Sequence, residues 1–240
     1  MILLHFRFIL LQLFRIPAFL VPTVLFPTML YLFFGGPNGG DLIDAQFPLG
    51  SFCVFAVMGV AFYQFGVGIA DDRGSPWESF MRVLPVTLFQ RFTARIMAAG
   101  VIAGLAILCL GIAGWSYGVT FSFGTWFGVG LALLAGTIPF CLFGVALGYL
   151  APQKAAVPIA NLIYLPLSFL GSVWSHPDSL PEGVAAFSPY LPSRMFAELV
   201  WAAIDGRFNL PQLGWLALYA VAAFGLCVWA YRRHESRAYT

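Results

Sequence analysis

The chain has 240 residues, of which 60% are hydrophobic and only 9% are charged, and its formal net charge is +2. Soluble domains carry roughly 45–50% apolar and about 25% charged residues, so this composition excludes a water-soluble fold of this size. The near-neutral balance gives no support for nucleic-acid binding. The composition therefore predicts an all-α polytopic membrane protein with a single domain over residues 1–240.

The first segment, residues 2–15, is apolar but carries Arg7 and Arg15. We expect an interfacial helix whose arginines extend to the membrane surface, with Pro17 at its junction to the first span. A cleaved signal peptide does not fit, because Arg15-Ile16-Pro17 interrupts the apolar run and no small-residue cleavage site follows Leu25.

Five stretches contain no Asp, Glu, Lys or Arg, and they hold 25, 26, 58, 23 and 24 residues: 16–40, 45–70, 96–153, 155–177 and 208–231. A spanning helix needs about 20 apolar residues, so four stretches fit one span each and the longest fits two, with a turn near 116–122. The pattern predicts six spans. Their expected cores are 18–35, 47–69, 96–115, 123–150, part of 155–177 and 211–231.

The basic residues predict the orientation, because cytoplasmic loops are enriched in Lys and Arg. With six spans both termini lie on one side, and that side holds ten of the twelve basic residues. The other side holds Arg194 and Arg207 together with six acidic residues. Both termini are therefore expected in the cytoplasm.

Three Gly-x-x-x-Gly pairs lie in the third and fourth spans: Gly100 and Gly104, Gly124 and Gly128, and Gly144 and Gly148. Such pairs permit close helix approach in lipid, but glycine is also common in membrane helices, so each pair is either a contact face or simple composition. The four cysteines all fall inside expected spans, where small buried apolar residues are the simplest interpretation.

Residues 71–95 form the most polar stretch. Ser75-Pro76-Trp77-Glu78 has the form of a capping box, with Pro at the first helical position, and Pro85 would end the short helix. The helix would display apolar and charged side chains together. Either a protein-docking surface or a solvated connector fits this pattern.

The outer segment, residues 175–210, contains several prolines and helical pieces too short to span, including an apolar patch at 184–187 and a run at 195–204. These pieces are expected to be re-entrant or interfacial helices buried against protein, because lipid cannot satisfy a broken backbone. Arg194 and Glu198 are four residues apart on a predicted helix and can form an exposed pair.

No catalytic motif is present. The single lysine, Lys154, is followed by alanine, so there is no P-loop, and no His-Glu-x-x-His or Gly-x-Ser-x-Gly occurs. His5, His176 and His234 are expected on both sides of the membrane, which excludes a three-His metal site. No expected span carries a charge near its middle, as a proton or ion pathway would require. Energy for any transport would have to come from another protein.

In these features the chain resembles the permease subunits of bacterial ATP-binding-cassette (ABC) exporters of the type-2 class, which export drugs, lipids and polysaccharides. Three regions carry the resemblance. They are Phe14-Arg15-x-Pro17-x-Phe19 with Phe26-Pro27; residues 69–87 with Asp71-Asp72-Arg73-Gly74, Glu78 and Leu84-Pro85; and Asn161, Pro166, Ser168, Gly171, Leu180-Pro181, Ser188-Pro189 and Leu191-Pro192. The sequence departs from the family pattern at Ser75-Pro76-Trp77 and at Ser193-Arg194-Met195.

The resemblance implies a multi-pass subunit of the bacterial cytoplasmic (inner) membrane that pairs with a second copy or a homologous permease and with separate ATPase subunits. ATP and Mg would bind to the ATPase, and no cofactor or metal is expected in this chain, which would not itself be an enzyme. The residues implied in coupling are Asp71, Asp72, Arg73, Trp77, Glu78, Phe80, Met81 and Arg82. Arg15 and Pro17 would belong to an elbow helix over residues 1–17, and Pro181, Pro189, Pro192, Arg194 and Glu198 to an outer gate.

Two alternatives stay open at this stage. One is a haem-exporter-like permease of similar size, and the other is a membrane-embedded enzyme or assembly factor, which no catalytic motif supports. The 17% aromatic content and the uncharged spans suit an apolar or amphiphilic substrate, although lipid-facing packing explains them equally well.

Overall fold

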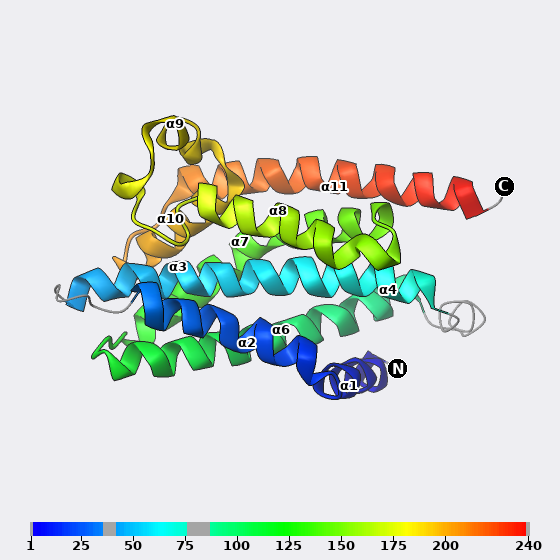
Figure 1. Cartoon of the computed structure of the whole chain (residues 1–240), viewed down its shortest axis with the longest axis horizontal. Helices are drawn as coiled ribbons and strands as arrows, with labels where there is room; N and C mark the ends of the chain where they lie inside the picture. The colour runs from blue at the N-terminus through cyan, green and yellow to red at the C-terminus, as the bar shows by residue number, and fades with distance from the viewer. Residues whose placement is uncertain (1, 36–41, 76–86, 239–240) are drawn as a thin grey trace.

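In the computed structural model, which describes residues 2–35, 42–75 and 87–238, long helices run roughly along the longest axis of the molecule (Figure 1). All regular structure in these residues is helical. The N-terminal part forms α1 (Ile2–Phe14), α2 (Pro17–Leu30), η1 (Tyr31–Gly35), α3 (Leu42–Ala61), η2 (Phe62–Val67) and α4 (Gly68–Gly74). The C-terminal part forms α6 (Leu88–Ser116), α7 (Phe123–Leu150), η3 (Gln153–Ala155), α8 (Ala156–Leu170), η4 (Pro177–Ser179), α9 (Glu182–Ala185), η5 (Ser188–Tyr190), α10 (Pro192–Ile204) and α11 (Leu210–Ala238).

Among the described residues, four helical segments are long and apolar enough to cross a bilayer: Ala45–Arg73, Phe89–Ser116, Phe123–Leu150 and Leu210–Glu235. Four of the six predicted spans therefore correspond to candidate membrane-spanning helices, and the count of six stays a prediction. The segment Leu20–Gly35 is shorter, and α8 has 15 residues against the roughly 20 that a span needs. Helix α8 ends early because the backbone turns at Gly171 and Ser172, where Ser172 has a φ of +57°, although no charge marks this turn in the sequence.

Several helix limits follow from local chemistry. Helix α2 begins at Pro17, as the sequence predicts, because proline lacks the N–H that a first helical residue leaves unpaired. Helix α7 has the predicted limits 123–150, and the hydroxyl of Ser122 caps it by accepting a 3.1 Å hydrogen bond from the N–H of Thr125.

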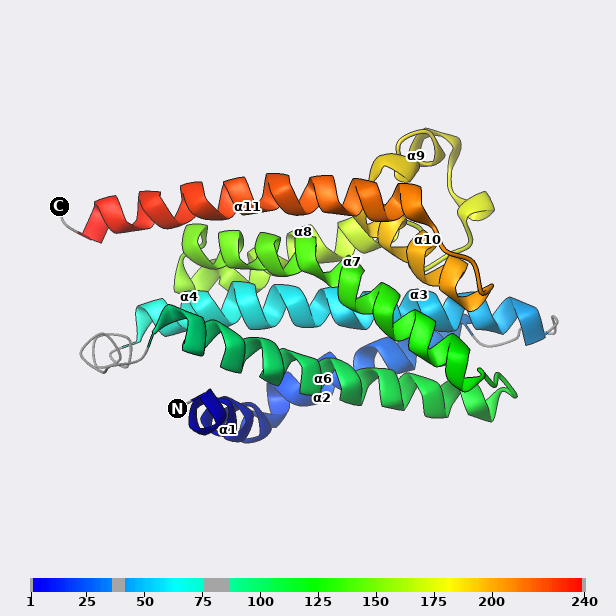
Figure 2. The same ribbon diagram turned by 180° about the vertical axis from the view of Figure 1, so that it is seen from behind.

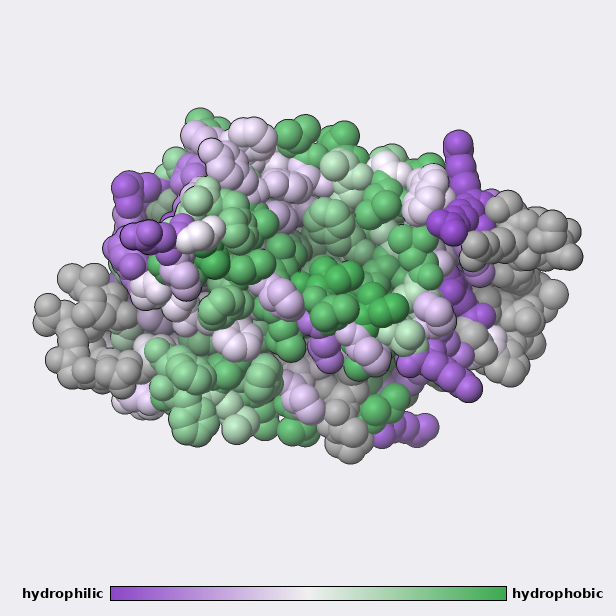
Figure 3. Space-filling model, turned by 45° about the horizontal axis from the view of Figure 1, so that its top comes forward, coloured by the Kyte–Doolittle hydropathy of each residue, from purple (hydrophilic) through white to green (hydrophobic). Residues whose placement is uncertain are grey.

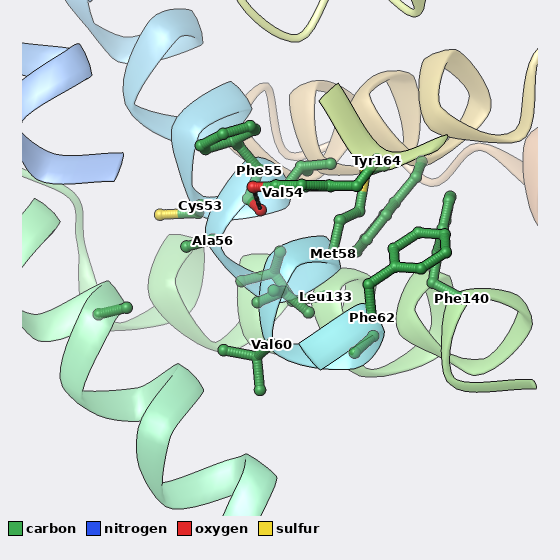
Figure 4. Close-up of a cluster of buried hydrophobic side chains, with 14 of the residues drawn as sticks. Cys53, Val54, Phe55, Ala56, Met58, Val60, Phe62, Leu133, Phe140 and Tyr164 are labelled. Carbon is green, nitrogen blue, oxygen red and sulfur yellow. Dashed lines mark hydrogen bonds between the residues drawn. The ribbon is translucent and has the colours of Figure 1, made fainter. Parts of the chain in front are cut away.

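The rod formed by α3, η2 and α4 runs through the centre of the molecule and is largely buried (Figures 1 and 2). It packs against α2, α6, α7, α8 and α10. Aromatic side chains dominate this core, as Figure 4 shows for Phe55, Phe62, Phe140 and Tyr164. The rings of Phe55 and Tyr164 stack at 4.8 Å, and the Tyr164 hydroxyl donates a 2.8 Å hydrogen bond to the carbonyl oxygen of Phe55. This bond satisfies a phenol that is otherwise surrounded by apolar groups.

One of the three predicted glycine pairs is a contact face within the chain. A Cβ on Gly144 would lie 2.7 Å from the carbonyl oxygen of Ala61, and one on Gly148 would lie 2.7 Å from that of Phe65. These two glycines therefore let α7 approach the backbone of the central rod. Gly100 and Gly104 instead face open space.

The short helices η4, α9 and η5 gather with α10 at one end of the molecule (Figure 1). Helix α10 packs its buried side against α3, α7 and α11. Helix α1 lies crosswise at the opposite end, where α11 also ends (Figures 1 and 2). The N-terminus and the C-terminus of the described chain therefore lie at the same end of the helix bundle.

Candidate functional site

The predicted coupling residues lie partly inside and partly outside the described chain. Asp71, Asp72 and Arg73 form the last turn of α4. Trp77, Glu78, Phe80, Met81 and Arg82 lie outside the described residues, as does most of the predicted capping box. The predicted loop over 71–95 was too long, because α4 continues to Gly74 and α6 already begins at Leu88. Residues 75–87 are thus all that joins the two helices.

Ser75 takes part in the end of α4. Its hydroxyl donates a 2.9 Å hydrogen bond to the carbonyl oxygen of Asp72, and its N–H also donates to that oxygen at 3.1 Å. The carbonyl groups at a helix C-terminus lack partners within the helix, and Ser75 supplies partners for the carbonyl of Asp72.

Arg95 ties α6 to the central rod. Its Nη2 donates to the carboxylate of Asp72 in an ion pair, and its Nη1 donates a 2.6 Å hydrogen bond to the carbonyl oxygen of Gln64. The two side chains of the pair are 15% and 35% exposed. Gly68 makes room for this contact, because a Cβ there would lie 2.5 Å from Nη1 of Arg95. The pair therefore braces the helices that enter and leave the segment 76–86.

Arg73 ties the end of α4 to the end of α7. Its guanidinium donates to the carbonyl oxygens of Tyr149 and Ala151, the latter at 3.3 Å. It also lies over the Tyr149 ring, 5.7 Å from its centroid. A cation at a helix C-terminus meets both the unpaired carbonyls and the negative end of the helix dipole. Arg73 and Arg95 thus attach α4 to α7 and α6 respectively.

The start of α6 has a feature that the sequence analysis missed. The Thr87 hydroxyl accepts a hydrogen bond from the N–H of Gln90, and the Gln90 side chain accepts one from the N–H of Thr87, both at 3.3 Å. This is a capping box, and its signal, Thr-x-x-Gln before a long apolar run, is present in the sequence. The cap fixes where the helix begins directly after the segment 76–86.

Helix α1, the predicted elbow helix, packs against α6 and α2. It ends at Phe14, so Arg15 and Pro17 lie at its junction with α2, as predicted. Burial lowers the pKa of His5 below its ordinary value of 6.5, and the positive charge of Arg91 lowers it further, while Asp72 acts in the opposite direction. His5 in α1 therefore interacts electrostatically with Arg95 and Asp72, the two residues that join α6 to α4.

At the opposite end, the predicted pair of Arg194 and Glu198 is confirmed, with 2.7 Å between Nε and Oε1. The prediction that this pair is exposed was wrong, since the two side chains are 13% and 24% exposed. Glu198 also accepts a 2.7 Å hydrogen bond from Gln212 of α11. The guanidinium of Arg194 lies 5.0 Å from the ring of Trp201, whose indole N–H donates to the Ser51 hydroxyl at 2.8 Å. The pair therefore belongs to a network that joins α10 to α11 and α3.

The three outer prolines each stand at a helix start: Pro181 caps α9, Pro189 lies at the beginning of η5, and Pro192 is the first residue of α10. A cavity of about 470 Å³ lies beside the Glu198 network. No motif in the sequence connects the residues that line this cavity, which are Phe47, Glu198, Trp201, Ala202, Asp205, Arg207, Phe208 and Asn209.

The buried apolar rod, the four candidate spans and the paired charges at the helix ends together define a multi-pass helical membrane protein. Over 157 residues the chain is 27% identical to the "Putative transport permease YvfS" of Bacillus subtilis (strain 168). The match covers 65% of this chain and 64% of the length of the relative. It supports the ABC-type transport permease family to which the sequence motifs point. No family model matches the chain, and no solved structure shows significant similarity to it.

Proposed function

We propose that this chain is the permease subunit of an ABC exporter of the type-2 class, and that two copies form a pathway driven by separate ATPase subunits. The observation that carries the proposal is the similarity to the transport permease of Bacillus subtilis. The resemblance of residues 14–27, 69–87 and 161–192 to the exporter class narrows the role from transport to ATP-driven export. An apolar or amphiphilic substrate suits the uncharged spans.

The bracing of α4 supports the role of residues 76–86 as the contact with the ATPase. A segment that transmits movement must be attached firmly to the helices that respond to it. Arg95 with Asp72 fixes one attachment, and Arg73 with the end of α7 fixes the other. A displacement of 76–86 would therefore move α4, α6 and α7 together rather than bend a flexible connector.

The proposed topology has six membrane crossings in the bacterial cytoplasmic membrane, with both termini in the cytoplasm. Besides the four long segments, α2 with η1 and α8 with η3 would make the remaining two crossings. The position of α1 and the end of α11 at one end of the bundle agrees with an even number of crossings (Figure 2). The excess of basic residues at that end supports its cytoplasmic assignment.

The segment from η4 to α10 is proposed as an outer gate. Helix α10 contacts the central rod through Trp201 and Ser51, and α11 through Glu198 and Gln212. A movement of the rod could reach the outer end of the molecule through these bonds. Deletion of residues 184–187 tests the gate, since unchanged transport by a well-folded complex would reduce the segment to packing.

A comparison of two substitutions in the native complex tests the coupling role. Glu78→Gln removes a negative charge that would engage a basic or donor group on the ATPase, where a hydrogen bond to a charged group is worth roughly 1.5–3 kcal/mol. Ser75→Ala removes the hydroxyl bond to Asp72 and keeps the charge. We expect Glu78→Gln to reduce transport-linked ATP hydrolysis more than Ser75→Ala at equal yield of complex. The opposite ranking would show that helix geometry, and not charge, is the contribution of this segment.

A further inference from the structure

The central rod contains a turn of π-helix, η2, between α3 and α4. In an α-helix each N–H donates to the carbonyl oxygen four residues earlier, whereas in a π-helical turn it donates five residues earlier. The N–H of Gly68 accordingly donates to the carbonyl oxygen of Tyr63 and not to that of Gln64. Such a turn holds one residue more than an α-helical turn, and π-helical turns inside α-helices are frequently found at functional sites. The rod is therefore shorter by one helical step, about 1.5 Å, than a continuous α-helix of the same residues.

Arg95 of α6 takes the carbonyl oxygen that η2 leaves without its α-helical donor. Its Nη1 donates a 2.6 Å hydrogen bond to the carbonyl oxygen of Gln64, and its Nη2 pairs with Asp72. Gly68 gives the guanidinium room, because a Cβ there would lie 2.5 Å from Nη1. One side chain thus stabilises the π-helical turn from outside the rod.

The π-helical turn also leaves a polar group unsatisfied. Gln64 is 4% exposed, and its side-chain Nε2 has no hydrogen-bond partner among the described residues. Most of η2 is buried with it, namely Phe62, Gln64, Phe65, Gly66 and Val67. An unpaired amide donor in such surroundings costs free energy, which the bonds of Arg95 offset. The stability of this turn therefore depends on Arg95.

Conversion of η2 to α-helix would shift α4 by one residue position, which is about 1.5 Å along the rod and about 100° around it. Asp71 would then take the place of Asp72 opposite Arg95. Because these two neighbouring residues are both aspartates, the ion pair between α4 and α6 can form in either register. Helix α4 therefore stays attached to α6 in both forms.

The attachment of α4 to α7 is possible in one register only. In the present form Arg73 donates to the carbonyl oxygens of Tyr149 and Ala151 at the end of α7. In the shifted register Asp72 would face these oxygens, and an ionised carboxylate has no hydrogen to donate. The shift would therefore release the end of α7.

The bond from Arg95 to Gln64 and the α-helical register exclude each other. In that register the N–H of Gly68 would donate to the carbonyl oxygen of Gln64, as in any α-helix. Val67 would stand where Gly68 now makes room for Nη1 of Arg95. Both changes displace Nη1, so the rod has two distinct forms and no mixture of them.

We propose that η2 is a reversible register switch in the rod, operated by the ATPase through residues 76–86. This inference rests on the coupling role proposed above. A movement of residues 76–86 towards the rod favours the shorter π-helical form, and a movement away from it favours the longer α-helical form. Figure 3 shows hydrophobic surface across the middle of one face and hydrophilic residues at both ends, and α4 ends at one of these ends (Figure 1). The switch thus connects a hydrophilic end of the molecule to the attachment of α7.

Deletion of a single residue tests whether η2 holds an extra one. Without Val67 the rod can form a continuous α-helix that keeps α3 and α4 in their present registers, so we expect the purified full chain to keep a thermal midpoint close to that of the parent. Deletion of Met58 is the matched control, because this residue is equally buried but lies in the α-helical part of the rod. Its loss would turn one part of the rod by about 100° against its neighbours, and we expect little folded protein.

Hydrogen exchange in the native complex tests the switch itself. The N–H groups of residues 66–70 change acceptors on conversion, so they become open to exchange at each passage between the two forms. During ATP turnover we expect faster exchange of residues 62–70 than without nucleotide, and no such increase in residues 50–58 of α3. Deletion of Val67 should abolish the increase. Arg95→Met should give fast exchange without ATP, because the carbonyl oxygen of Gln64 then loses its donor.

Three results would overturn the proposal. A deletion of Val67 as damaging as that of Met58 would show that η2 holds no extra residue. Equal exchange of residues 62–70 with and without ATP, in a complex that hydrolyses ATP, would show that η2 does not switch, although the permease role would stand. A complex that hydrolyses no ATP would contradict the permease role itself and, with it, the operation of the switch by an ATPase.

Discussion

The guanidinium of Arg95 in α6 pairs with the carboxylate of Asp72 in α4, although 23 residues separate them and the segment 76–86 lies between. The same guanidinium also bonds to the backbone of η2, so the pair is held on the central rod at two points. Helices α4 and α6, which precede and follow the proposed coupling segment, are therefore joined directly to each other at its two ends.

A double-mutant cycle on Arg95→Gln and Asp72→Asn should give a coupling energy of about 1–2 kcal/mol, above that of an exposed pair because both side chains are partly buried. The measurement is the free energy of unfolding in mixed micelles for the two single variants, the double variant and the parent. Additive losses would show that the two side chains stabilise the protein separately and do not brace the segment.

Gly148→Ala should destabilise the protein by about 1–3 kcal/mol, the usual cost of overpacking, because the new Cβ would lie 2.7 Å from a backbone oxygen of the rod. Gly104→Ala is the control, since its Cβ would meet nothing within 4 Å and alanine favours the helix. The measurement is the thermal midpoint of unfolding of each purified variant, compared with that of the parent protein. Equal destabilisation of the two would contradict the assignment of Gly144 and Gly148 as the contact face.

The packing of α1 should depend on pH through His5. Because burial and Arg91 lower the pKa of His5 below 6.5 in the folded protein, the folded state favours the neutral imidazole. The packing is then at full strength above the ordinary value of 6.5 and weakens as the pH falls through the lowered pKa. Hydrogen exchange of residues 2–14, measured between about pH 5 and 8 and corrected for intrinsic exchange rates, should show this loss of protection.

His5→Gln should make the corrected protection of α1 much less dependent on pH over that range. His176→Gln, in the exposed outer segment, should leave the dependence as it is in the parent. A pH dependence that survives in His5→Gln would assign it to another group.

The two outer arginines should respond differently to substitution. Arg194→Met breaks a pair that is 13% and 24% exposed and leaves Glu198 with Gln212 as its only described partner, so we expect a loss of about 2 kcal/mol in unfolding free energy. Arg207→Met breaks a pair with Asp205 in which the arginine is 75% exposed, and it should cost well under 1 kcal/mol. If the outer segment is a gate, Arg194→Met also changes ATPase turnover of the complex. Equally small losses of unfolding free energy in the two variants would show that the Glu198 network does not hold the outer segment in place, which contradicts its role in a gate.

The parts of the fold that could be predicted are those that local sequence determines. Helix α7 has its predicted limits because an apolar, uncharged run follows the capping residue Ser122. The pair of Arg194 and Glu198 follows from helical spacing alone. The early end of α8 at Leu170 was not predictable from charge, because the turn that ends it carries none.

The contacts of the candidate site could not be predicted from the sequence, because they join residues that are far apart in the chain. Arg95 pairs with Asp72, and Trp201 donates a hydrogen bond to Ser51, 150 residues away in the chain. Both contacts form only because the other helices pack around the central rod. The sequence likewise offered three equivalent glycine pairs, and only the packing of α7 distinguishes Gly144 and Gly148 from Gly100 and Gly104. The aromatic network around Tyr164 depends on the same long-range packing.

ATP hydrolysis by the purified chain, compared with that of the complex isolated from its native membrane, tests whether this chain is the permease of an ATP-driven transporter. The chain carries no Gly-x-x-x-x-Gly-Lys-Ser/Thr motif, so any turnover must belong to a partner. We expect no hydrolysis by the pure chain, and vanadate-sensitive hydrolysis by a complex that contains a separate polypeptide with a P-loop. Turnover by the pure chain, or a native complex without such a polypeptide, would contradict the assignment as an ATP-driven permease.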